Sequence, residues 1–275
     1  MANHPFRIAI ETQAAAETCR ELFAENVVLH APMLSKPIKG RNQVWKVIST
    51  AAATAGPLRY ARELNDGVQT FLFWSGRISG LELQALTVLV DDDEGRIREV
   101  RVLMRTWPIV TLFRDAMRKA LDGEVPAESW ELGPRNAPTG NARRFTPIAL
   151  SKIELAPDIE LHSPMLARSV KGLDLVRPSL ELAHSVQTAS SYTSIIARPD
   201  LVVELFDCDA DGYPMEGMWV SRLNTSGLID DLTVYLRPYP AVTVLRNRAK
   251  AIAEKSPKLT FLNDGYWELA TRRVA

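Results

Sequence analysis

The feature that most constrains this 275-residue sequence is an internal repeat. Residues 24–40 read AENVVLHAPMLSKPIKG and residues 156–172 read APDIELHSPMLARSVKG, with eight of 17 positions identical, where unrelated segments would share about one. His30 therefore corresponds to His162, and adding 132 to a residue number in the first copy gives its counterpart in the second. A chain with the same pattern twice is expected to fold as two similar units.

The offset holds further along the chain without a gap. RIREVRVLMRTWPIV at 96–110 falls on LIDDLTVYLRPYPAV at 228–242, and both copies then close with Trp-Glu-Leu, at 130–132 and 267–269. Each copy has about 130 residues, enough for a core of its own. The stretch between them is rich in Gly, Pro, Asn and Arg, which is typical of a linker. The sequence predicts domains at 1–133 and 148–275, joined by a linker at 134–147.

Periodicity within the first copy predicts an α+β domain. Apolar residues at helical and strand spacing predict helices at 11–24, 42–55 and 110–121 and strands at 27–33, 58–64, 68–75, 83–90 and 96–105. Asn65-Asp66-Gly67 is a strong hairpin turn. In the second copy, Pro147 and Pro157 limit the opening helix to 148–155 at most, because proline forbids an interior helical hydrogen bond.

The final strand of each copy alternates between apolar and polar residues. Val100, Val102 and Met104 share one face, which we expect to be core, while Arg105 lies on the other. Arg105 and its counterpart Arg237 are candidates to bind a substrate carboxylate or phenolate bidentately. They could equally pair across a contact between the domains, and we favour that alternative because both copies keep the arginine.

Composition excludes several functions. The chain has 33 Lys and Arg residues and 33 Asp and Glu residues. It therefore lacks the net positive charge that is typical of proteins that bind nucleic acid, and we expect no nucleic-acid partner. Cys19 and Cys208 are out of register between the copies, which argues against a disulfide framework or a metal site. No Gly-rich phosphate loop or nucleophile elbow is present. We therefore expect no cofactor and no metal.

The sequence also predicts a cytoplasmic protein without a membrane partner. Residues 1–10 lack a basic segment followed by an apolar run, and Arg7 interrupts the one candidate. No apolar stretch approaches the ~20 residues needed to cross a bilayer.

Two motifs resemble those of a known superfamily. The first is L-H-[AS]-P-M at the end of the first strand, followed by K-G and a helix. The second is G-[RL]-I-x-x-[VL]-x-V-x-x-R-x-x-P on the last strand. Both are similar to motifs of the nuclear transport factor 2-like superfamily, and within it of the SnoaL-like proteins. The resemblance covers 8–121 and 148–253. It implies a cystatin/SnoaL-like cone in each copy, a curved antiparallel sheet closed by helices around an apolar pocket. It also implies pairing of the two domains as an intrachain pseudo-dimer and leaves further homo-oligomerisation open.

The resemblance implies a cofactor-independent lyase or isomerase that transfers protons on a hydrophobic aromatic or polycyclic small molecule. Many relatives carry an Asp on the penultimate strand, where this chain has Thr87 and Trp219. This departure favours the alternative, a non-catalytic small-molecule binding or scaffold protein with the same fold. A third alternative is a duplicated domain whose polar sheet faces serve only assembly.

His30 and His162 are the histidines in register, and imidazole can shuttle protons near neutral pH. In the resembling family this strand position commonly faces the pocket, so we expect His30 to be the catalytic base. Alternatively, each imidazole ties its strand to the following loop. Tyr60 and Tyr192, also in register, could donate to an enolate oxygen or be core aromatics.

Three further residues have more than one interpretation. Trp74 and Trp219 could line an aromatic-substrate pocket or simply fill the core. Glu204, between Val203 and Leu205, would have a raised pKa and could act as a base if it were buried. Strand alternation favours a solvent-facing Glu204 instead.

Overall fold

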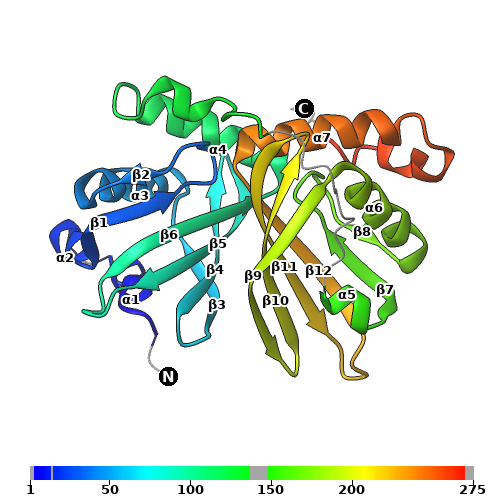
Figure 1. Ribbon diagram of the computed structural model, residues 1–275, viewed down its shortest axis with the longest axis horizontal. Helices are drawn as coiled ribbons and strands as arrows, with labels where there is room; N and C mark the ends of the chain where they lie inside the picture. The colour runs from blue at the N-terminus through cyan, green and yellow to red at the C-terminus, as the bar shows by residue number, and fades with distance from the viewer. Residues whose placement is uncertain (1–2, 14, 137–147, 270–275) are drawn as a thin grey trace. The chain divides into compact units, whose positions relative to one another are not determined.

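The chain divides into two compact units. A computed structural model describes residues 3–13, 15–136 and 148–269 (Figure 1). One unit comprises Met1–Met104 and Ile109–Gly133, and the other comprises Arg105–Pro108 and Pro134–Ala275. Most of the expected linker, 137–147, lies outside the described residues, so its character and the exact domain ends stay a prediction.

The first copy contains helices, a mixed sheet and a short 3-10 helix. The helices are α1 (Pro5–Glu11), α2 (Ala16–Glu21), α3 (Arg41–Thr54), α4 (Trp107–Ala120) and η1 (Ala127–Trp130), and the strands are β1 (Phe23–His30), β2 (Ile38–Lys39), β3 (Arg59–Asn65), β4 (Gln69–Ile78), β5 (Leu81–Asp91) and β6 (Ile97–Arg105). The strands β3, β4, β5 and β6 are neighbours in that order (Figure 1). β1 pairs in parallel with β6, and β2 pairs antiparallel with β1.

The second copy repeats this order of elements. Its members are α5 (Ile148–Lys152), β7 (Leu155–His162), β8 (Val170–Lys171), α6 (Leu173–Val186), β9 (Thr188–Arg198), β10 (Leu201–Ala210), β11 (Tyr213–Leu223), β12 (Ile229–Arg237), α7 (Tyr239–Ala253) and η2 (Pro257–Asn263). β9, β10, β11 and β12 are neighbours in that order, β7 is parallel to β12, and β8 is antiparallel to β7. The α+β fold class and the duplication are therefore confirmed.

Local chemistry explains the hairpin between β3 and β4. Gly67 has a φ of 93°, a left-handed conformation that glycine adopts without a side-chain clash. Its N–H donates to Asn65 Oδ1 at 2.7 Å, and the Gln69 N–H donates to Asp66 Oδ1 at 2.7 Å. The predicted turn at this position is confirmed.

The prediction of one opening helix at 11–24 is wrong. The chain forms α1 and α2 instead, separated by a turn in which Gln13 has a φ of 53°. α1 starts early because the Phe6 N–H donates to His4 Nδ1 at 3.1 Å, and because Phe6 is buried. Phe23, the first residue of β1, also belongs to the sheet. In the second copy α5 is short, as Pro147 and Pro157 predict.

The closing Trp-Glu-Leu of each copy is held by an arginine on the preceding helix. Arg114 Nη2 on α4 donates to the Trp130 carbonyl at 2.9 Å, and Arg246 Nη2 on α7 donates to the Trp267 carbonyl at 2.7 Å. The two arginines are 132 residues apart, like the rest of the repeat. Both copies therefore close with the same hydrogen bond.

Neither cysteine forms a disulfide, and Cys19 and Cys208 are both buried. Within the residues that the structure describes, no helix combines the length and the apolar character needed to span a membrane.

Gly217 on β11 leaves the space that its neighbours fill. A Cβ atom there would overlap the Phe206 ring and lie 2.6 Å from Leu236 Cδ2. The counterpart in the first copy is Ala85. Gly217 is therefore required by the bulk of the aromatic ring on the adjacent strand.

We predict that Gly217→Ala lowers the free energy of unfolding by about 1–3 kcal/mol, the usual effect of overpacking a core. Urea denaturation followed by circular dichroism measures this. Gly133→Ala is the matched control, because its added Cβ would lie 3.6 Å from Ser35 Cβ, an ordinary contact. Equal stability of the two variants would show that the space around Gly217 is not constrained.

Candidate functional sites

The first unit contains a pocket lined mostly by hydrocarbon side chains. Including its open mouth, the space is about 580 Å³. Its walls come from α1, β1, α3 and the sheet, and they include Leu29, Met33, Val47, Ile48, Val102 and Met104. Tyr60, Trp74 and Thr87 bring the polar side-chain groups of the lining. Val100, Val102 and Met104 face inward, as the strand pattern predicts.

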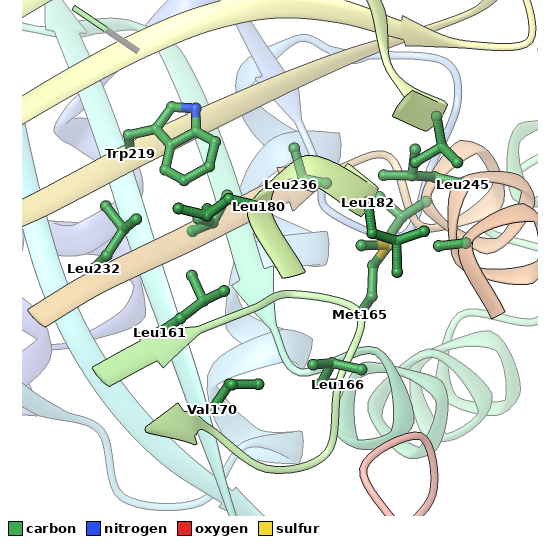
Figure 2. Packing of buried hydrophobic residues seen from close by; sticks show 14 of the residues in the cluster. Leu161, Met165, Leu166, Val170, Leu180, Leu182, Trp219, Leu232, Leu236 and Leu245 are labelled. Carbon is green, nitrogen blue, oxygen red and sulfur yellow. The ribbon is translucent and has the colours of Figure 1, made fainter. Parts of the chain in front are cut away.

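The second unit contains a similar pocket of about 500 Å³, again including its open mouth. Figure 2 shows part of its wall, where side chains from β7, the loop after it, α6 and β11 converge. They include Leu161, Met165, Leu180, Leu182 and Trp219. Gln187, Leu262 and Trp267 also belong to the lining.

The two pockets occupy corresponding places in the repeat. Ten lining positions of the first pocket have counterparts 132 residues later that line the second, among them Leu29 and Leu161, and Met33 and Met165. The remaining walls differ. α1 brings Phe6 and Ile10 to the first pocket, whereas the closing segment brings Leu262 and Trp267 to the second.

Tyr60 on β3 lines the first pocket, and its side chain carries a hydroxyl group. Burial raises the pKa of this phenol, and Glu11 raises it further, while Arg7 opposes them. The Arg7 guanidinium carbon lies 5.5 Å from the centre of the ring. A phenol with a raised pKa stays protonated, so Tyr60 can donate a hydrogen bond but is a poor base at neutral pH.

Tyr192, the counterpart of Tyr60, is placed differently. It lies on β9 opposite Phe206, partly buried against the core of the second unit, and is outside the pocket lining. Sequence register therefore places the two tyrosines on equivalent strands but does not give them equivalent surroundings.

Trp74 and Trp219 both line pockets. Trp74 Nε1 donates to Thr87 Oγ1 at 2.9 Å, so the Thr87 hydroxyl accepts a hydrogen bond from the neighbouring strand. Trp219 replaces Thr87 in the second copy and packs on Phe206, with ring centres 6.2 Å apart. The same position is therefore a small polar group in one pocket and a large aromatic one in the other.

The expectation that His30 and His162 face the pockets is wrong. Leu29 lines the first pocket, and His30, the next residue on the strand, lies outside the lining because successive strand side chains point to opposite faces. His30 Nε2 lies 3.2 Å from Glu99 Oε1, and His162 Nε2 lies 3.1 Å from Asp231 Oδ2. Each imidazole pairs with a carboxylate on the neighbouring strand.

These pairs change the ionisation of the carboxylates. The hydrogen bond from His30 lowers the pKa of Glu99, helped by the Arg101 guanidinium, although partial burial opposes the change. Burial alone would raise the pKa of Asp231, but the hydrogen bond and charge of His162 outweigh it and lower the pKa. Both copies thus stabilise a carboxylate anion on the sheet face away from the pocket.

Arg105 and Arg237 are buried and lie outside the two pocket linings, each with 5% of its surface exposed. Arg237 Nη1 pairs with Glu216 Oε1 at 2.8 Å. The structure thus does not place either guanidinium where a pocket ligand would contact it. The solvent-facing interpretation of Glu204 is also wrong, since this side chain has 0% exposure and accepts a hydrogen bond from the Ala149 N–H at 3.3 Å.

Sequence reasoning missed several lining residues. Phe6 and Ile10 have the i, i+4 spacing of one helix face, a signal that was available. Gln187 and Trp267 lie on separate elements and have no local signal that joins them. In the described residues, no group of three or more His, Cys, Asp or Glu side chains is arranged to hold a metal ion.

We predict that the His30–Glu99 pair makes the free energy of unfolding depend on pH in the acidic range. The pKa of Glu99 is lower in the folded protein than in the unfolded chain. The carboxylate therefore adds to the free energy of unfolding above the ordinary Glu pKa of about 4.3, and this stabilisation is lost as the pH falls through the pKa of the folded protein. Glu99→Gln should remove about 1 kcal/mol at neutral pH. It should also flatten the loss of stability in acid, measured by urea denaturation at a series of pH values.

Glu94→Gln is the matched control, because Glu94 is exposed and pairs with Arg96 away from His30. It should keep the wild-type acid dependence. An unchanged acid dependence in Glu99→Gln would contradict the role of this pair.

Comparison with known proteins gives matches among solved structures. No protein-family model matches the chain, and no curated protein does. An uncharacterised bacterial protein with a cystatin-like fold from Silicibacter pomeroyi is 23% identical, with a TM-score of 0.41, and covers 43% of this chain and 86% of its own. A steroid delta-isomerase from Pseudomonas aeruginosa is 24% identical, with a TM-score of 0.40, and covers 42% and 87%.

An NTF2-like protein of unknown function from Cytophaga hutchinsonii is 16% identical, with a TM-score of 0.30, and covers 36% of this chain and 82% of its own. Each match spans less than half of this chain. At these identities the similarity concerns the fold alone. The element order of each unit agrees with the α+β fold class expected from the sequence.

Proposed function

We propose that this chain binds small apolar molecules, one in the pocket of each unit. The observation that carries the proposal is the hydrocarbon lining, repeated at equivalent positions such as Val102 and Val234. Transfer of apolar surface from water into such a lining releases about 25 cal/mol per Å². Binding therefore needs no charged group in the ligand.

Tyr60 adds selectivity to the first pocket. Its phenol stays protonated because of the raised pKa, so it donates a hydrogen bond to an oxygen of the bound molecule. Thr87 already accepts from Trp74 Nε1. An aromatic or cyclic hydrocarbon with a carbonyl or ether oxygen fits this arrangement.

A second candidate function is proton transfer by a lyase or isomerase. The observation in its favour is the same Tyr60 hydroxyl, since a donor aimed at a carbonyl oxygen stabilises the enolate formed next to it. His30 is not proposed as the base of this reaction, because its imidazole lies outside the pocket lining and pairs with Glu99.

We predict that p-xylene binds in the first pocket and shifts the methyl NMR resonances of Met33 and Met104, which line it. Ala51→Phe should weaken this binding at least about tenfold, because Ala51 lines the pocket and the added ring occupies the ligand's space. Titration of methyl-labelled protein measures both effects.

Ala53→Phe is the matched control, on the same helix but exposed. It should bind p-xylene like the wild type, with circular dichroism showing that both variants are folded. An absence of methyl shifts in the wild type, or undiminished binding in Ala51→Phe, would reject the first pocket as a binding site.

The two candidate functions predict different results with cyclohexanone in D₂O. If the chain only binds, the rate of deuterium incorporation next to the carbonyl equals that without protein, and this is the result we expect. An isomerase or lyase would accelerate the exchange, and Tyr60→Phe would reduce that acceleration about 100-fold, the usual effect of losing one oxyanion donor. Proton NMR of the ketone measures the exchange.

A further inference from the structure

Two buried polar atoms distinguish the second pocket from the first. Gln187 and Trp267 line it with 5% and 3% of their surface exposed. Within the part of the chain that the structure describes, Gln187 Oε1 and Trp267 Nε1 have no hydrogen-bond partner. A buried polar atom without a partner is costly, so a molecule that supplies partners to both is favoured in this pocket.

The two serines that line the same pocket each have a hydrogen-bond partner. Ser163 Oγ accepts from the Met165 N–H at 3.2 Å, and Ser179 Oγ donates to the Leu175 carbonyl at 2.8 Å. Each of these serine oxygens therefore has a partner, whereas Gln187 Oε1 and Trp267 Nε1 have none within the described residues.

The first copy has no glutamine at the position that corresponds to Gln187. Gln187 caps the end of α6, where its backbone N–H donates to the Ala183 carbonyl at 3.2 Å. The counterpart in the first copy is Ala55, which has no polar side chain. The duplication thus places an amide beside the second pocket at a position where the first has only a methyl group.

Trp267 is held in place from outside the pocket. Its carbonyl accepts from Arg246 Nη2 at 2.7 Å, and the Arg246 guanidinium carbon lies 5.7 Å from the centre of a Trp267 ring. Arg246 also pairs with Glu268 Oε1 at 2.6 Å. These contacts fix the residue that carries the indole N–H, so binding does not have to order it.

Apart from Ser163 and Ser179, the rest of the wall is mostly hydrocarbon. Leu161, Leu180 and Leu182 surround the space together with the Trp219 ring (Figure 2). A charged ligand would lose its hydration here without an opposite charge in the lining to compensate. The ligand therefore has a hydrocarbon body and a neutral polar group.

We propose that the second pocket selects a neutral hydroxylated small molecule, such as a phenol or a cyclic alcohol. Its O–H donates to Gln187 Oε1, and its oxygen accepts from Trp267 Nε1. This inference rests on the proposed binding function and adds a difference between the two pockets. The first takes a molecule that only accepts a hydrogen bond from Tyr60, while the second takes one that both donates and accepts.

Titration of the full chain with p-cresol and p-xylene tests this, because the two probes differ by a hydroxyl in place of a methyl group. Met165 lines the second pocket and Met33 the first, so their methyl resonances report the two sites separately. At Met165 we expect p-cresol to bind at least about tenfold more tightly than p-xylene. Gln187→Leu and Trp267→Phe should each reduce this preference to about threefold or less while p-xylene still binds.

Gln43→Leu and Trp45→Phe are the matched controls, because both residues lie outside the two pocket linings. They should keep the wild-type preference at Met165. Equal binding of the two probes at Met165 in the wild type would overturn the inference and leave the binding function intact. A failure of both probes to shift Met33 and Met165 would overturn both proposals.

Discussion

The parallel pairing of β1 with β6, repeated as β7 with β12, sets which side chains face each pocket. In the first unit Leu29 is in register with Val100 and His30 with Arg101. Because the side-chain period of a strand is two residues, this register turns Leu29 toward the pocket and His30 away from it. The same register in the second unit places Leu161 in the pocket lining and leaves His162 outside it. A hydrocarbon pocket and an outer face with paired charges follow from one register.

The two pockets differ because a few positions of a shared scaffold have diverged. Thr87 in the first copy corresponds to Trp219, and Ala55 corresponds to Gln187. The first of these changes replaces a hydroxyl with an aromatic ring, and the second adds an amide next to the cavity. The backbone that carries them has the same strand order in both copies. Different binding preferences therefore need no change of fold.

The segments at the two ends of each copy add a further difference. α1 lines the first pocket through Phe6 and Ile10, whereas α5 has only five residues and is absent from the lining of the second. In the second unit Leu262 and Trp267, from the closing segment, take part in the wall. Arg246 holds that segment by its hydrogen bond to the Trp267 carbonyl. In the second unit, residues outside the sheet thus bring the Gln187 amide and the Trp267 indole to the pocket.

Several properties follow from local sequence alone. The repeat can be read directly from the sequence. The turn at Gly67 and the short α5 depend on residues close in the chain, such as the Asn65 side chain that accepts from the Gly67 N–H. The inward face of the last strand follows from its alternation for the same reason.

Tertiary structure decided the rest. The break between α1 and α2 depends on the burial of Phe6 and on β1 starting at Phe23. The direction of His30 depends on how β1 pairs with β6, and the meeting of Gln187 and Trp267 at one pocket depends on how α6 and the closing segment pack. Sequence spacing carries no information about such contacts, because they join residues that are neighbours only after the chain has folded.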